Sequence, residues 1–240
     1  MTTTLPRIYI NSDLAVNSVL ELSGKQYNYL VNVMRKRSDD CIIVFNSEDG
    51  EFKGVIQEIS KKFLQIKLAN LLREKQNLCN KVILAFAPIK NNNTNLIIQK
   101  ATELGISKIL PILTARTVVN NINYEKLMSI AIEASEQSER LDVPEIGVLA
   151  NLKKLFEIQY DIAFFCDENE IDNSIFNALG KIKNFRTILI VVGPEGGFTE
   201  NEREFLKSTQ NTIPIRLNNG ILRSETAAIS AIAIIKAALL

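Results

Sequence analysis

The sequence predicts an α/β protein in which a small β-rich domain, residues 1–72, precedes a larger α/β domain, residues 73–240. Two observations carry this prediction. The first domain shows several short strand patterns around one helix pattern, which suggests a small β-barrel. The second alternates short apolar runs with helix-length segments. Strands that are apolar on both faces and alternate with helices are typical of a mostly parallel sheet covered on both sides.

The elements of the first domain follow from local patterns. Strands are expected at residues 8–10, 41–45 and 63–71, and the last of these alternates apolar with polar side chains. The Asp-Gly pair at 49–50 predicts a tight hairpin. One helix is expected to begin at Ser23, because serine is a favourable N-cap residue.

The elements of the second domain alternate regularly. Strands are expected at 82–89, 108–113, 161–166, 187–192 and 213–217. Helices are expected at 94–104, 124–140, 172–183, 199–210 and 224–240. Thr199 and Glu202 form the pattern of a capping box, which fixes the start of the fourth of these helices. Because open parallel sheets bind ligands at the carboxyl ends of their strands, the loops at those ends are the first place to look for a site.

Composition excludes several kinds of site. The chain has no histidine, which removes the commonest general base and every zinc site that needs that residue. Cys41, Cys79 and Cys166 are scattered and form no CxxC pair, so we expect a reducing cytoplasm and no metal. With a net charge of +1, the protein would meet a nucleic acid only through a local basic patch.

Two further segments bear on the membrane question. The most apolar stretch, residues 227–240, is short and interrupted by Lys236, so we expect a buried helix and no membrane span. The first ten residues lack a basic segment followed by a long apolar one, so no secretory signal is expected.

The loop after the strand at 187–192 reads Gly-Pro-Glu-Gly-Gly-Phe. Gly193, Gly196 and Gly197 leave little side-chain bulk, so a ligand can approach the backbone. The loop is neither a P-loop nor a GxGxxG dinucleotide fingerprint, and Glu195 would repel phosphate. A carboxylate beside bare amides suits ribose hydroxyls or a positively charged ligand, and S-adenosylmethionine (SAM) offers both. A plain strand–helix turn is the alternative at this point.

A second loop, within residues 216–228, follows the next strand. It again contains a glycine, Gly220, and Ser224 or Thr226 is expected to cap the last helix. A helix cap does not account for Arg223 and Glu225, which lie at the same sheet edge as the first loop.

The two loops together resemble those of the SPOUT, or trefoil-knot, RNA methyltransferases. More narrowly, the chain is similar to the ribosomal RNA small subunit methyltransferase E family, the 16S rRNA uridine-N3 methyltransferases. Segments 87–90, 97–117 and 133–146 also match the pattern of that family in order, so the resemblance covers nearly the whole chain.

The resemblance is weaker in the N-terminal signature at 29–40. Tyr29, Met34 and Ser38 stand where the family usually has histidine, leucine and glycine. The replacement of histidine by Tyr29 puts one contact of the N-terminal domain in doubt, and leaves the methyl-transfer chemistry untouched.

The resemblance implies a PUA-like N-terminal β-barrel that helps to hold RNA, a C-terminal α/β domain with a deep trefoil knot, and a cytoplasmic homodimer. It implies SAM as the cofactor, enclosed by loops around 193–198 and 217–222, with no metal and no membrane. The implied partner is 16S rRNA within the assembled small ribosomal subunit. The implied cofactor-binding residues are Phe165, Val192, Gly193, Gly196, Gly197, Leu217, Gly220, Ile221 and Leu222.

Methylation at N3 of uracil requires loss of the N3 proton. Without histidine, a carboxylate base or a cation that stabilises the uridylate must assist. Arg223 is the candidate for the electrostatic role, and Glu225 or Glu195 for the base; direct loss of the proton to water is a further possibility. The alternative for Arg223 is an ion pair with one of these glutamates that only shapes the loop.

RNA contacts are expected from basic residues outside the pocket: Arg7, Arg35, Arg37, Lys100, Arg116 and Arg140. Each taken singly is typical of a solvated surface, but as a group they would supply a basic patch. Two other functions stay open. One is a knotted methyltransferase that acts on a ribose 2′-hydroxyl or on tRNA; the other is an inactive RNA-binding factor for ribosome assembly.

Overall fold

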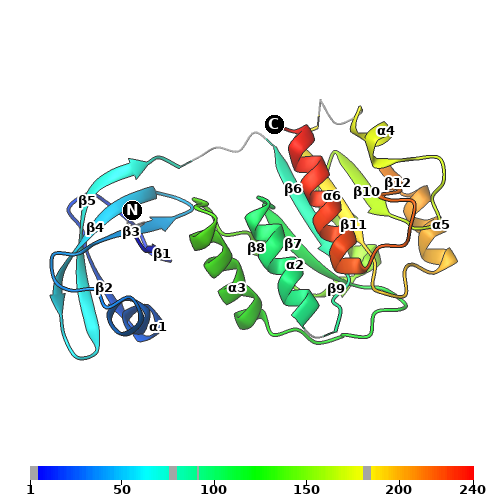
Figure 1. Cartoon of the computed structure of the whole chain (residues 1–240). Helices are drawn as coiled ribbons and strands as arrows, with labels where there is room; N and C mark the ends of the chain where they lie inside the picture. The colour runs from blue at the N-terminus through cyan, green and yellow to red at the C-terminus, as the bar shows by residue number, and fades with distance from the viewer. Residues whose placement is uncertain (1–4, 76–79, 91, 181–184) are drawn as a thin grey trace. The chain divides into compact units, whose positions relative to one another are not determined.

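The computed structural model of the chain describes residues 5–75, 80–90, 92–180 and 185–240. Cys79 and part of the helix expected at 172–183 lie outside these ranges. Residue contacts divide the chain into two compact units. One comprises Met1–Asn77 with Ser135–Val143, and the other comprises Leu78–Ala134 with Pro144–Leu240 (Figure 1). The domain boundary between residues 72 and 73 remains a prediction.

The first unit is built on a five-stranded mixed sheet. Its spatial order is β1 (Arg7–Tyr9), β3 (Cys41–Asn46), β4 (Gly50–Ile59), β5 (Phe63–Arg73) and β2 (Val19–Ser23). β1 runs parallel to β3, and the other neighbours are antiparallel. The alternation predicted for residues 63–71 is confirmed, because Leu64, Ile66 and Leu68 of β5 are fully buried in the core.

The helix expected in this unit begins where predicted but is irregular. α1 (Gly24–Tyr27) continues directly into a π-helical segment, η1 (Asn28–Val33). Ser23 occupies the N-cap position, but its side chain makes no capping hydrogen bond. Leu30 is the buried residue that attaches this short helical segment to the core.

A buried charged cluster joins three strands of the first unit. Arg7 on β1 donates to Glu51 Oε1 on β4 at 2.9 Å, and Arg73 on β5 donates to the other oxygen of the same carboxylate. The Arg7 guanidinium lies 4.2 Å from the centroid of the Phe45 ring. It also donates to three carbonyl oxygens of the segment 135–140, namely those of Ser135, Glu136 and Arg140. The cluster therefore attaches residues 135–143 to the N-terminal sheet.

The second unit is built on a parallel sheet, as predicted. Its spatial order is β12 (Thr212–Ile215), β10 (Ile162–Cys166), β11 (Thr187–Val192), β6 (Lys81–Phe86), β7 (Lys108–Leu113) and β8 (Glu145–Ile146), and β9 (Ala150–Asn151) also pairs with β7. The pairings within this sheet are parallel. β10, β11 and β6 consist almost entirely of buried apolar residues, which is the pattern of a sheet covered on both faces.

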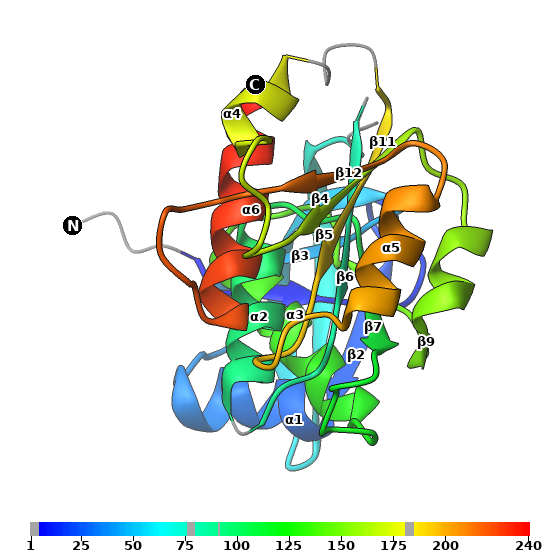
Figure 2. The same cartoon turned by 90° about the vertical axis from the view of Figure 1, so that its right-hand side faces the viewer.

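Helices cover both faces of this sheet. α2 (Asn92–Glu103) and α6 (Ser224–Ala238) lie on one face and α5 (Glu200–Ser208) on the other (Figure 2). The 3-10 segment η2 (Leu152–Glu157) packs with α5 in the same apolar cluster. α3 (Tyr124–Gln137) agrees with the helix expected at 124–140, whereas only α4 (Ile175–Leu179) is present in the described part of the region expected at 172–183. No helix among the described residues has the length and apolar content to cross a membrane.

The strand order determines where a site can form. β10, β11 and β12 are neighbours and run parallel, so the three loops that follow them meet at one edge of the sheet. The capping box predicted at Thr199 and Glu202 is confirmed and fixes the start of α5 directly after the second of these loops.

Candidate active site

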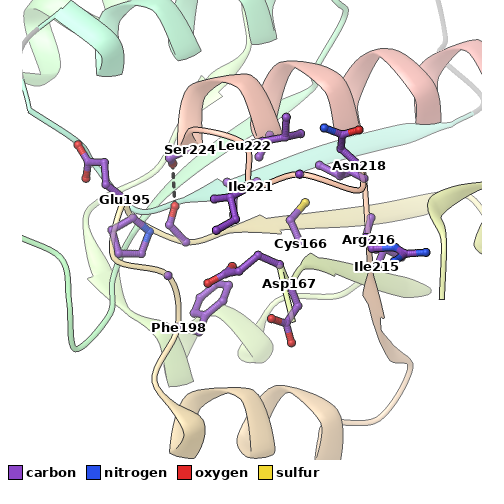
Figure 3. A pocket seen from close by; sticks show the side chains of 18 residues that line it. Cys166, Asp167, Glu195, Phe198, Ile215, Arg216, Asn218, Ile221, Leu222 and Ser224 are labelled. Atoms are coloured by element: carbon purple, nitrogen blue, oxygen red, sulfur yellow. Dashed lines mark hydrogen bonds between the residues drawn. The ribbon is translucent and has the colours of Figure 1, made fainter. Parts of the chain in front are cut away.

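The loops after β10, β11 and β12 surround a pocket with about 610 Å³ of empty space, part of it open to solvent (Figure 3). It is lined by residues 166–168, 192–195, 197–198, 215–218 and 220–222, with two further residues from the first turns of α6. The pocket therefore lies where an open parallel sheet is expected to bind a ligand.

The glycines of the first loop are each packed against another side chain. A Cβ on Gly193 would come within 3.2 Å of the Phe198 ring, and one on Gly196 would come within 3.3 Å of Arg116 Cδ. Gly197 has a φ of +67°, and a Cβ there would overlap the Glu168 carboxylate. The missing side chains thus make room for neighbouring protein groups, and the backbone of Gly193 and Gly197 still lines the pocket.

A buried hydrogen bond connects the first loop to the second. The Ser224 hydroxyl donates to the Gly193 carbonyl at 2.7 Å, drawn as the dashed line in Figure 3. The prediction that Ser224 or Thr226 caps α6 is wrong, because Arg223 occupies the N-cap and Ser224 is the first helical residue. The hydroxyl expected to cap the helix instead holds the two pocket loops together.

Three acidic residues line the pocket. Glu168 and Glu195 are exposed and form no ion pair among the described residues. The pKa of Arg203 is raised by its hydrogen bond to Glu200 and, less strongly, by the charge of Glu168. Asp167 is only 2% exposed; its Oδ1 accepts from the Asn169 amide and its Oδ2 has no hydrogen-bond partner. Burial, and then the charge of Asp167, raises the pKa of Cys166 to about 12. The Cys166 thiol is therefore neutral at physiological pH and is no nucleophile.

The three candidate catalytic residues differ in environment. Glu195 is on the first pocket loop, and Arg223 and Glu225 are at the start of α6. Arg223 is exposed, and no carboxylate among the described residues pairs with it, so the ion pair considered for it is absent there. Glu225 is 9% exposed; its Oε1 accepts from Asn93 at 3.1 Å, and its Oε2 is buried without a partner. Glu195 is on the pocket rim. The guanidinium of Arg223 is thus left available for another anion.

Most residues expected to bind the cofactor line this pocket: Val192, Gly193, Gly197, Leu217, Gly220, Ile221 and Leu222. Phe165 and Gly196 do not. Phe165 is fully buried below the pocket, where its ring packs edge-on against Phe198 with centroids 6.2 Å apart. Gly196 is exposed, and its carbonyl accepts from Arg116.

The sequence reasoning named Phe165 at the end of β10 as a pocket residue but none of the residues that follow it, and it did not name Ile215, Arg216, Ser224 and Ala227 as pocket residues. Pro194, Phe198 and Asn218 lie within the two loops that were expected to enclose the cofactor but were not singled out. For residues 166–168 a signal was present, because they follow the apolar run 161–166 as the other two loops follow theirs. The periodicity of the strands does not reveal contacts between the pocket loops, such as the hydrogen bond from Ser224 to Gly193.

The basic residues expected to bind RNA fall into different environments. Arg7 is 7% exposed, with its donors used inside the first unit, and Arg140 pairs with Asp142 there. In the second unit, Lys100 pairs with Glu103 and Arg116 donates to the Gly196 carbonyl. Arg35 and Arg37 are exposed, and no carboxylate among the described residues forms an ion pair with either.

Comparison with known proteins defines the class of molecule to which this fold and pocket belong. The family model of an RNA methyltransferase domain matches residues 75–236, and that of an RNA methyltransferase PUA domain matches residues 22–69. The chain is thus an RNA methyltransferase by family. Among the described residues, no group of three or more acidic or cysteine side chains is arranged to hold a metal ion.

Individual relatives narrow this class. The ribosomal RNA small subunit methyltransferase E of Rickettsia conorii is 41% identical over 95% of this chain and 93% of its own length. The protein of the same name from Bacillus subtilis is 32% identical over 89% of this chain and 88% of its own. The chain belongs to the ribosomal RNA small subunit methyltransferase E family. The resemblance seen in the sequence is therefore confirmed.

A solved structure agrees with this assignment. A methyltransferase structure from Legionella pneumophila, with the cofactor SAM bound, superposes with a TM-score of 0.88 and 27% identity, covering 98% of each chain. The expected fold class is confirmed: a C-terminal α/β trefoil-knot domain with a small N-terminal PUA-like domain.

Proposed function

We propose that this protein transfers a methyl group from SAM to N3 of a specific uridine in 16S rRNA of the small ribosomal subunit. The observation that carries this proposal is the pocket at the carboxyl ends of β10, β11 and β12, in a chain that belongs to the methyltransferase E family. The Legionella pneumophila relative holds SAM, and the names of the curated relatives give the small-subunit rRNA as substrate.

The chemistry of the pocket fits SAM. The carboxylates of Glu168 and Glu195 suit the positive charge and the ribose hydroxyls of this molecule. Apolar side chains, such as those of Val192, Leu222 and Ala227, suit the adenine ring. The loops contain neither a P-loop nor a GxGxxG fingerprint, and among the described lining residues Arg216 is the one basic side chain. When bound, SAM supplies an electrophilic methyl group, and the protein must orient the uracil and manage its proton.

Arg223 is the residue that we propose stabilises the uridylate. Arg223 is exposed and follows Leu222 and precedes Ser224 in the sequence, both of which line the pocket, and its guanidinium has no carboxylate partner in the described part of the chain. A cation placed there lowers the free energy of a uracil that has lost its N3 proton. Glu195 or Glu225 would accept that proton. Glu225 is already held by Asn93 and buried, so Glu195 is the more accessible of the two.

We also propose that the protein acts as a homodimer on the assembled small subunit. Exposed large apolar side chains of the second unit support a second copy as partner, because Ile171, Phe176 and the pocket-lining Ile221 are 74%, 72% and 87% exposed. The molar mass in solution, measured by light scattering coupled to gel filtration, tests the dimer. A mass that stays at that of one 26.9 kDa chain contradicts it.

Methyl transfer from labelled SAM tests the function itself. The substrates are small ribosomal subunits from a strain that lacks the protein, their naked RNA, and tRNA. Mass spectrometry then identifies the methylated nucleoside. We expect 3-methyluridine, confined to small-subunit RNA, and a loss of kcat in Arg223→Ala with little change in SAM binding.

The other outcomes separate the remaining functions. Label in a 2′-O-methyl nucleoside or in tRNA would keep the cofactor and the fold but replace the substrate. Binding of SAM or RNA without any transfer to these substrates would point to a ribosome assembly factor that has lost catalysis.

A further inference from the structure

Arg116 lies outside the pocket, on the loop between β7 and α3, but its side chain contacts the loop that forms the pocket. Its Nη1 donates to the Gly196 carbonyl at 2.6 Å and lies 3.5 Å from the Phe198 carbonyl oxygen. Its aliphatic stem lies over Gly196, with Cδ and Cβ 3.3 and 3.4 Å from the position that a Cβ would occupy there. One side chain thus donates to the Gly196 carbonyl and also fills the space beside this glycine where a Cβ would stand.

Neighbouring contacts hold this segment in place. The Ala115 amide donates to Glu202 Oε1 at 2.7 Å, while Oε2 of the same carboxylate accepts from the Thr199 amide in the capping box of α5. Thr114 and Thr117 close a tight turn, because the Thr114 amide donates to the Thr117 hydroxyl at 2.9 Å. Segment 114–117 is therefore a fixed turn attached to the second half of the pocket loop and to the start of α5.

The two carbonyls depend on Arg116 to different degrees. The Phe198 carbonyl also accepts from Arg203 at 3.3 Å, so it keeps a donor without Arg116. The Gly196 carbonyl has Arg116 as its hydrogen-bond donor among the described residues. Because Gly196 is exposed, water can replace this bond, and its loss should change the order of the loop far more than the stability of the fold.

We infer that Arg116 is a positioning residue for the cofactor loop: it holds Gly196, and with it the pocket-lining Gly197 and Phe198, in the conformation that binds SAM. This inference rests on the proposed function for the identity of the ligand. A loop that is competent to bind only part of the time lowers the apparent affinity in proportion to that fraction. The role differs from an RNA contact, because it acts on the cofactor site in the absence of RNA.

The test compares Arg116→Ala and Arg116→Lys with wild type, and uses Arg186→Ala as matched control. Arg186 is an exposed arginine at the amino end of β11, opposite the pocket, and no carboxylate among the described residues pairs with its guanidinium. The Kd for SAM is measured by calorimetry without RNA. Hydrogen exchange of the amides at 193–199 is measured on the SAM-free protein, and RNA affinity is measured separately.

For Arg116→Ala we expect a Kd for SAM about tenfold weaker, which corresponds to a loop competent about one tenth of the time. We also expect faster exchange at 193–199, unchanged RNA affinity, and a raised KM for SAM with kcat retained at saturation. Lysine keeps the charge and most of the stem, so Arg116→Lys should restore part of the affinity. Arg186→Ala should resemble wild type in every measurement.

Several results would overturn the inference. An unchanged Kd for SAM in Arg116→Ala, or an equal loss in Arg186→Ala, contradicts it. Loss of RNA affinity alone, rescued fully by lysine, would make Arg116 an RNA contact. If wild type itself binds no SAM, the proposed function fails together with the inference, whereas equal SAM binding by wild type and Arg116→Ala removes only the inference.

Discussion

Gly197 shows how a single residue shapes the pocket. Its φ of +67° is in the left-handed region, and the Glu168 carboxylate occupies the space where a side chain would begin. Glycine is therefore required there for two independent reasons, one in the backbone and one in packing. Both reasons act on a residue that lines the pocket, so the cost of a substitution falls on the site directly.

Gly197→Ala should lower the free energy of unfolding by about 1–2 kcal/mol through the left-handed backbone alone, and should also displace Glu168 and weaken SAM binding. Gly220→Ala is the control within the same pocket, because Gly220 has no positive φ and its nearest neighbour is 3.7 Å away. Urea unfolding and calorimetry with SAM give the two quantities. Equal stability of the two variants would contradict the explanation of Gly197.

Ser224 is a second residue that shapes the pocket, through the hydrogen bond from its hydroxyl to the Gly193 carbonyl. Ser224→Ala removes the donor to the buried Gly193 carbonyl and leaves that oxygen unpaired, which costs about 1–3 kcal/mol. Ser208→Ala, which removes an exposed bond to the Phe205 carbonyl on α5, should cost much less. Thermal unfolding of both variants measures the difference. A Tm shift no larger for Ser224→Ala than for Ser208→Ala would count against the connection between the loops.

Among the elements, β1, β4 and β5 are joined by one buried carboxylate. Burial by itself raises the pKa of Glu51, but the hydrogen bonds and charges of Arg73 and Arg7 outweigh it and hold that pKa below its ordinary value of 4.5. A group with a lowered folded pKa stabilises the protein above its unfolded pKa and loses this contribution as pH falls. The strands of the first unit are thus coupled to the ionisation of Glu51.

The free energy of unfolding should therefore fall as pH decreases below about 4.5, and more steeply in wild type than in Glu51→Gln. The difference between the two curves isolates Glu51 from the other carboxylates. Urea unfolding at a series of pH values from neutral to acid, monitored by a probe in the first unit, supplies both curves. Parallel curves would show that Glu51 does not carry the effect. At neutral pH, Glu51→Gln should be the less stable protein, because Arg7 then lacks its buried counter-charge.

Elements with strong periodicity were predictable from the sequence, and irregular ones were not. β5, β10 and β11 and the capping box of α5 follow from alternation, apolar runs and cap chemistry, all of which act between near neighbours. A helix was expected over η1, but its π-helical geometry has no such local signal, and neither do the two-residue strands β8 and β9. The position of Ser224 depended on a contact with Gly193, 31 residues away, and local cap chemistry gave the wrong partner.

At the scale of the whole molecule, the candidate functions are divided between the two units. The second unit contains the pocket, whose carboxylates favour a cationic ligand. The first unit contains a PUA domain and the exposed Arg35 and Arg37. A protein of net charge +1 cannot attract RNA by its overall charge, so its affinity must come from such local cations. Substitutions in the first unit should therefore weaken RNA binding and leave SAM binding unchanged.

The double variant Arg35→Ala/Arg37→Ala should bind small-subunit RNA more weakly than wild type. When phosphate contacts are lost, fewer counterions are released as the RNA binds. The slope of log affinity against log salt concentration should therefore become shallower by about 1–2. SAM affinity and kcat at saturating RNA should not change, since the pocket belongs to the other unit.

The matched control is Lys61→Ala/Lys62→Ala, which removes two exposed cations from the turn between β4 and β5 of the first unit. If both double variants lose the same affinity, RNA binding reflects only the total charge of the first unit. If only the arginine variant does, the segment after η1 contacts the RNA backbone.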